Sequence, residues 1–212
     1  PNPSGPTGRG RIEYVVWSDV FVCPNCSTEL VWWDLVFRGP GKATPKLVRC
    51  SGCNAAHTIN SLQRVWTSFH DHELNQVVRQ AKQVPALINY SVGKRRFEKT
   101  PDAEDIAVIE RSLREPLPAP LSPVPMPVGF NTSQPLNSHG FSHAHHFYTR
   151  RNLILLTAMR HAFDRAFSSP RDRARALYIF TGMIQRVCRL NRYMPNHDRH
   201  VGPQEFHVRL QH

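Results

Sequence analysis

Residues 14–37, YVVWSDVFVCPNCSTELVWWDLVF, place a Cys-x-x-Cys pair between two runs rich in aromatic and β-branched residues. Such runs are typical of β-strands, so the stretch predicts two strands joined by a turn that carries Cys23 and Cys26. In the second strand, Trp32 and Trp33 would point to opposite faces. The stretch therefore predicts a small β-unit built around two thiols.

A second Cys-x-x-Cys pair, Cys50 and Cys53, lies 23 residues after the first. Two such pairs on separate hairpins can bring four sulfurs into a tetrahedron, the arrangement of a zinc ribbon. Four thiolates leave no coordination position for water, so the zinc would be structural. The predicted zinc ligands are Cys23, Cys26, Cys50 and Cys53.

Other uses of the cysteines explain the pattern less well. A redox-active Cys-x-x-Cys would leave the second pair without a role, and two disulfides would require an oxidising compartment. Residues 1–10, PNPSGPTGRG, lack the apolar segment of a signal peptide and read as a linker, so we expect a cytoplasmic protein. The fifth cysteine, Cys188, stands among apolar residues of a predicted helix and is expected to be a buried free thiol.

The chain of 212 residues has a net charge of +11 and a pI of about 10.0. The excess is concentrated in residues 150–212, which contain 12 Arg, no Lys and 4 acidic residues. A concentrated basic segment favours an anionic partner, most commonly nucleic acid, although general solubility is the alternative. No run of 18 apolar residues occurs, so no membrane-spanning helix is expected.

The patterns predict an α+β protein: a small β-rich zinc ribbon, a hairpin, a helix, a proline-rich extended segment and two longer helices. The expected segments are a linker at 1–10, the zinc-ribbon β unit at 11–69, a hairpin plus helix at 70–115, a Pro/His-rich connector at 116–148 and a basic helical segment at 149–212.

Several local signals refine this organisation. Residues 70–83 read as a short helix or a loop, 86–99 as the hairpin, and 130–148 as irregular. Asp102 and Thr149 are the predicted N-caps of two helices. The last helix is expected to run from about residue 170 to 193, with 194–212 as a loop or tail.

Nine basic residues and one asparagine on these elements are the candidate DNA contacts. Three lie at the predicted hairpin tip, three at a helix start, and four along one side of the last helix. They are Lys94, Arg95 and Arg96; Arg150, Arg151 and Asn152; and Arg171, Arg175, Arg186 and Arg189. The alternatives are an ordinary solvated turn at the tip, and an arginine face that meets an acidic protein.

A histidine-rich stretch precedes the helix that begins after Thr149. It contains His139, His143, His145 and His146, so a second metal site is one interpretation. These residues precede a helix instead of lying at i and i+4 on one, and no His-Glu-x-x-His motif occurs. The pattern therefore favours polar contacts around the helix start at 150–152.

Three segments together resemble a known family. They are YVVWSDVFVCPNC (14–26), AKQVPALINYSVGKRRFEKTPDAEDIAVIE (81–110) and HAHHFYTRRNLILLTAM (143–159). They resemble the zinc-ribbon-containing, adenine-specific DNA methylases of bacteria and phages, enzymes of the restriction-modification type. The resemblance spans residues 11–201.

The resemblance implies methyl transfer from S-adenosylmethionine to adenine in duplex DNA by the complete enzyme. Residues 37–41, FRGPG, fit the spacing of the family's Phe-x-Gly-x-Gly loop, but neither GPG at 39–41 nor GRG at 8–10 lies after a predicted strand and before a predicted helix, and no Asp/Asn-Pro-Pro-Tyr/Phe motif occurs. The chain therefore looks like the middle of such a methyltransferase, a target-recognition-like region without catalytic residues, whose partners are duplex DNA and the remaining segments of the methylase.

A second hypothesis is a zinc-stabilised protein-interaction module that docks on the catalytic part of a methylase or on an acidic partner. An independent enzyme is disfavoured, because no nucleophile–base pair and no metal site with an open water position is visible.

Overall fold

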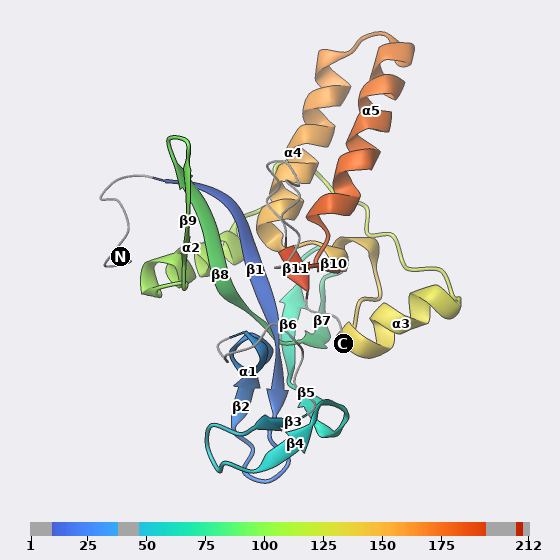
Figure 1. Cartoon of the computed structure of the whole chain (residues 1–212). Coiled ribbons are helices and arrows are strands. Elements are labelled where there is room, and N and C mark those ends of the chain that lie inside the picture. Colours follow the sequence, from blue (N-terminus) through green and yellow to red (C-terminus); the bar gives the residue numbers. More distant parts are fainter. Residues whose placement is uncertain (1–9, 38–46, 194–206, 210–212) are drawn as a thin grey trace.

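The computed structural model describes residues 10–37, 47–193 and 207–209, and it has the predicted α+β architecture (Figure 1). The long strand β1 (Arg11–Val22) runs through the centre of the molecule. Its first part belongs to a large curled sheet, and its end carries the cysteine-rich unit. The five-segment division of the chain stays a prediction, since β1 is shared by two of the structural units.

The large sheet is organised around β1. Among the described residues its strand order is β10 (Asn191–Arg192), β11 (His207–Arg209), β1, β8 (Gln83–Val92) and β9 (Arg95–Lys99). β8 runs antiparallel to β1, and two register shifts between these strands interrupt the pairing. Such irregularities bend and twist strands, which agrees with the curled sheet.

The hairpin expected at 86–99 is confirmed as β8 and β9. Its turn contains Gly93, whose φ of 61° is readily adopted by glycine. The predicted tail is wrong at 207–209, because these residues pair with β1 in parallel as β11. The linker residues 1–9 and the tail residues 194–206 and 210–212 lie outside the described residues.

The cysteine-rich unit is built at the end of β1. Strands β2 (Glu29–Val31) and β5 (Gln63–Arg64) pair with β1, while β3 (Leu47–Arg49) and β4 (Ala56–Thr58) form a separate hairpin, followed by the 3-10 turn η1 (Ile59–Ser61). A buried cluster holds the unit together and contains two of the cysteines. Its members are Phe21, Cys23, Leu30, Trp32, Val36, Val48, Cys50 and Leu62.

The second strand predicted within 14–37 is wrong beyond Val31, where the short helix α1 (Trp32–Val36) begins. Helical geometry buries Trp32 in the cluster and lets Trp33 stack on Phe37 four residues later, at a centroid distance of 4.6 Å. The backbone N–H of Trp33 donates to Ser18 Oγ at 2.8 Å. This packing outweighs the β-propensity of the aromatic run.

The short helix or loop predicted at 70–83 is also wrong, because this region belongs to the hairpin of β6 (Trp66–Asp71) and β7 (Gln76–Ala81). Its turn is stabilised by Asp71, whose Oδ1 accepts hydrogen bonds from the backbone N–H groups of Glu73 and Leu74. An Asp at this position fixes a turn through local backbone contacts.

The helix predicted after Asp102 is confirmed as α2 (Ala103–Arg114), with Asp102 and Asp105 forming a reciprocal capping box. The proline-rich segment that follows contains no helix. The irregular stretch predicted at 130–148 is wrong in part, because it contains α3 (Phe130–His139) and the 3-10 turn η2 (Ala144–Phe147). Gly140 ends α3 in the left-handed conformation, with φ of 74°.

Two antiparallel helices extend away from the sheet as a hairpin (Figure 1). The first, α4 (Arg150–Ala166), is capped by Thr149 as predicted. The second, α5 (Pro170–Ile184), is shorter than the predicted 170–193 and is followed by the 3-10 turn η3 (Gln185–Val187). The buried helical environment expected for Cys188 is wrong, because Cys188 is a half-buried residue with extended backbone at the end of η3.

The chain after η3 contacts the sheet instead of continuing as a helix: Arg189 bonds to Gln80 and Gln83, and β10 follows. Within the described residues, no helix is both long and apolar enough to cross a membrane.

Candidate metal centre and basic surface

The two Cys-x-x-Cys turns have the same backbone geometry. In each, the N–H of the first cysteine donates to a carbonyl five residues later, that of Thr28 or Ala55, at 2.9 Å. The residue after the second cysteine, Ser27 or Asn54, has φ of 60° and donates its N–H back to the first cysteine's carbonyl. The turns therefore present two sulfurs each in equivalent ways.

The four predicted ligands converge on one point between the two turns. Cys23 Sγ lies 3.7 Å from Cys53 Sγ, and Cys26 Sγ lies 3.5 Å from Cys50 Sγ. All four sulfurs lie within 4.8 Å of one another. A tetrahedron with metal–sulfur bonds of about 2.3 Å has edges of about 3.8 Å. The four cysteines thus lie close enough to bind a metal ion.

Neighbouring polar groups lower the pKa of Cys26 and Cys50 and so favour their thiolate forms. At Cys53 the lowering effect of the Ala55 backbone N–H is outweighed by the neighbouring sulfurs, chiefly that of Cys26, and by burial, which together raise the pKa to about 12. Gly52 N–H donates to Cys50 Sγ at 3.3 Å, and the Thr28 side chain lowers the pKa of Cys26 to about 6. His57 Nε2 lies 3.2 Å from Cys23 Sγ and is buried with it. The sequence interpretation missed His57; its position four residues after Cys53 was the available signal.

The hairpin tip of β8 and β9 is exposed at all three predicted positions, Lys94, Arg95 and Arg96. Behind it, Tyr90 stacks on Phe97 with centroids 5.6 Å apart, and the Arg95 guanidinium lies 5.6 Å from the Phe97 ring centroid. The stacked pair of Tyr90 and Phe97 therefore packs at the base of the hairpin tip that carries the three basic residues.

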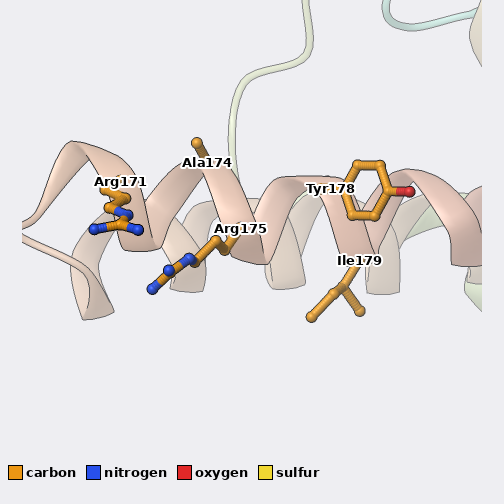
Figure 2. Close-up of a pocket in the computed structure, with 5 residues that line it drawn as sticks. All are labelled: Arg171, Ala174, Arg175, Tyr178 and Ile179. Atoms are coloured by element: carbon orange, nitrogen blue, oxygen red, sulfur yellow. The ribbon is translucent and has the colours of Figure 1, made fainter.

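One face of α5 combines basic and apolar side chains. Arg171, Ala174, Arg175, Tyr178 and Ile179 follow helical spacing and line a shallow, open hollow (Figure 2). Tyr178 and Ile179 are 81% and 66% exposed. Arg175 also donates to Asp172 at 3.1 Å. This face is open to a partner.

Arg150, Asn152 and Arg189, three of the predicted DNA contacts, bond to distant parts of the chain. Arg150 pairs with Glu73 at 2.6 Å and donates to the carbonyl of Glu115. Asn152 is buried and donates to the Val187 carbonyl. Arg189 donates to Gln80 and Gln83 and lies over the Phe141 ring, with 4.7 Å to the centroid. The remaining two, Arg151 and Arg186, are exposed.

The histidine-rich stretch makes its main contacts with acidic groups on other elements. His145 Nε2 and His146 Nε2 lie 2.9 and 2.8 Å from Asp71 Oδ2. His139 Nε2 lies 3.6 Å from Asp19 Oδ2, and His143 contacts Ser142. These contacts differ from the expected grouping around 150–152.

Asp71 carries an unusual electrostatic environment that sequence reasoning missed. Burial raises its pKa, but hydrogen bonds from His145 and His146 outweigh this and lower the pKa of Asp71 to about 2. Burial lowers the pKa of His146 below its ordinary value. The sequence around Asp71 does not indicate its contacts with the histidines, because these partners lie 74 and 75 residues later in the chain.

Comparison with known proteins adds no relative: no family model matches the chain, and neither curated proteins nor solved structures include a significant match.

Proposed function

We propose that this chain is the zinc-ribbon and DNA-contacting region of a site-specific adenine DNA methyltransferase. The observation that carries the DNA-contacting role is the exposure of two basic surfaces, the tip at 94–96 and the Arg171–Arg175 face of α5. Both the β8–β9 turn and the helical hairpin extend toward the top of Figure 1, while the cysteine-rich unit lies at the bottom. The methylase assignment itself rests on the sequence resemblance.

The metal in this proposal is a structural zinc ion held by Cys23, Cys26, Cys50 and Cys53. Four sulfur donors are the ligand set that zinc prefers in structural sites, and the four sulfurs here lie within 4.8 Å of one another. Two of the sulfurs belong to the buried cluster around Trp32, so the ion would join the two turns to that small core. No coordination position would be left for a reacting water.

The proposed DNA surface uses the exposed side chains. Guanidinium and ammonium groups bind phosphates through charge and hydrogen bonds, and an exposed aromatic such as Tyr178 offers a stacking surface beside them. Arg150, Asn152 and Arg189 would have to break internal contacts to reach DNA, so their part in the proposal is to hold the helical hairpin in place.

Methyl transfer and S-adenosylmethionine enter the proposal only for the complete enzyme, through the family resemblance. An enzyme that methylates adenine in a duplex must take the base out of the stack. This region would hold the duplex while other segments perform the chemistry.

The experiment is duplex binding by the full chain over a range of salt concentrations. We expect the logarithm of the DNA affinity to fall linearly with the logarithm of the salt concentration. The steepness of this line should decrease by about 0.9 for each phosphate contact that a substitution removes. Alanine at Lys94, Arg95 and Arg96, or at Arg171 and Arg175, should reduce the slope. Arg173→Ala is the matched control, because Arg173 lies on α5 but approaches Asp164 of α4. A flat salt response, or no binding at low salt, contradicts the proposal.

A second candidate function is a protein-interaction module. It is favoured by the exposed apolar side chains of α5, where Ile179 and Met183 are 66% and 43% exposed beside Tyr178. Here the α5 face would dock on the catalytic part of a methylase or on an acidic subunit. The discriminating variants are Arg175→Glu and Ile179→Glu: if DNA affinity persists while assembly with the partner fails, the second candidate is correct.

A further inference from the structure

Asp71, His145 and His146 form a second group of potential metal ligands, separate from the cysteines. Asp71 is the last residue of β6, and the two histidines lie on η2. All three are buried, with exposed fractions of 4%, 7% and 3%. The fold thus gathers one carboxylate and two imidazoles from elements that are far apart in the sequence.

The carboxylate of Asp71 is oriented by its own turn. Its Oδ1 accepts the N–H groups of Glu73 and Leu74 at 3.0 and 3.1 Å, so Oδ2 is directed toward the histidines. The two imidazole rings are inclined at 68°, with centroids 4.4 Å apart, and both present Nε2 to the same oxygen. Outer contacts of this kind hold ligands in place at metal sites.

We propose that Asp71 Oδ2, His145 Nε2 and His146 Nε2 bind a divalent transition-metal ion. Two imidazoles and one carboxylate are a ligand set used for zinc and for iron(II). Bonds of about 2.0–2.2 Å separate ligand atoms by roughly 2.8–3.1 Å at octahedral angles and roughly 3.3–3.6 Å at tetrahedral angles. The observed 2.8 and 2.9 Å fit the octahedral case, and tetrahedral binding requires an outward shift of about half an ångström.

Hydrogen bonding alone is the competing explanation. His146 Nδ1 accepts the N–H of Ser142 at 3.2 Å, which leaves its proton on Nε2 and directs it to Asp71. Metal binding at Nε2 would move the His146 proton to Nδ1. A protonated Nδ1 cannot accept the Ser142 N–H, so this 3.2 Å contact would be lost. His145 Nδ1 has no hydrogen-bond partner within the described residues, so only the contact with Asp71 favours a proton on its Nε2.

A metal ion here would connect two distant parts of the fold. It would join the β6–β7 hairpin to η2, directly before the helical hairpin that carries Arg171 and Arg175. The ring of His143, whose centroid lies 5.7 and 5.5 Å from those of His145 and His146, is a candidate for a fourth ligand. With His143 as the fourth ligand, no position of a tetrahedral ion would remain for water, and the ion would be structural.

The test is metal binding by the full chain, with zinc for stoichiometry and cobalt(II) for spectroscopy. We expect two zinc ions per chain, and a cobalt signal with both thiolate charge-transfer bands and a separate contribution from nitrogen and oxygen ligands. Asp71→Asn keeps a hydrogen-bond acceptor for the imidazoles but removes the charged ligand. It should reduce zinc to one ion per chain and leave the thiolate bands unchanged.

His145→Gln should have the same effect, and His161→Gln, on the exposed side of α4, is the matched control. The cobalt spectrum of the unaltered chain needs no variant, so poor folding of a variant does not decide the outcome. Zinc bound only by thiolates, with no nitrogen–oxygen component in the cobalt spectrum, overturns the proposal and leaves a hydrogen-bonded cluster. Loss of the thiolate bands alone would contradict the zinc ribbon instead.

Discussion

Arg189 donates two hydrogen bonds to the side-chain oxygen of Gln83, at 3.0 and 2.6 Å, across 106 residues of sequence. The same guanidinium donates to Gln80, and it lies over the ring of Phe141. It thereby ties the end of η3 to strand β8 and to the segment after α3. Arg189, which the sequence predicts to contact DNA, thus connects elements that are far apart in the chain.

Arg189→Ala should therefore reduce the stability of the folded chain. Removing the charged hydrogen bonds to buried Gln80 and half-buried Gln83 costs about 2–3 kcal/mol, measured as the free energy of unfolding in urea. Arg186→Ala is the control, since Arg186 is exposed on the adjoining turn and should change stability by less than about 0.5 kcal/mol. Equal effects of the two substitutions would contradict the structural role.

The two classes of cysteine should respond differently to substitution. Cys50→Ser removes a buried sulfur at the four-cysteine site, so the chain should lose the ribbon's metal and expose Trp32 of the same cluster. Cys188→Ser should leave metal content unchanged, because Cys188 is not among the clustered sulfurs. Metal analysis and tryptophan fluorescence measure both effects. Retention of the ribbon's metal in Cys50→Ser would exclude the four-thiolate site.

Gly140→Ala should destabilise the chain, because alanine would be strained at φ of 74° and its Cβ would lie 2.2 Å from the carbonyl oxygen of Arg79. We expect a loss of about 2–4 kcal/mol in the free energy of unfolding. The matched substitution is Gly182→Ala, within α5, where a Cβ meets no atom within 4 Å. It should stabilise the chain by about 0.5–1 kcal/mol. Opposite signs for the two glycines are the expected result.

The start of α2 should weaken in acid. The backbone N–H of Asp105 and the side chain of Lys99 hold the pKa of Asp102 well below its ordinary value of about 3.9. A lowered pKa in the folded chain means that the contribution of Asp102 is present above pH 3.9 and is lost as the pH falls through the folded value.

Hydrogen exchange at the first turn of α2 measures this acid response. Asp102→Asn is the comparison, because asparagine also caps helices but does not titrate. A decline in protection below pH 4 in both proteins would show that Asp102 is not its source.

Local chemistry made much of the fold predictable. The two cysteine turns, the β8–β9 hairpin and the caps at Asp102 and Thr149 depend on contacts between residues only a few positions apart. A sequence pattern contains such information directly. For that reason the sequence alone predicts both the clustering of the four cysteines and the α+β class.

Long-range packing decided the rest. Whether Trp32 begins a helix depended on the buried cluster around Phe21, and whether Arg189 faces solvent depended on Gln83. Asp71 meets His145 only because the β6–β7 hairpin packs beside η2, 74 residues later. By itself, the sequence determined the local turns, caps and cysteine spacing, since these form within one segment. Only the tertiary structure decided which polar side chains are buried together, because that depends on elements that no local pattern connects.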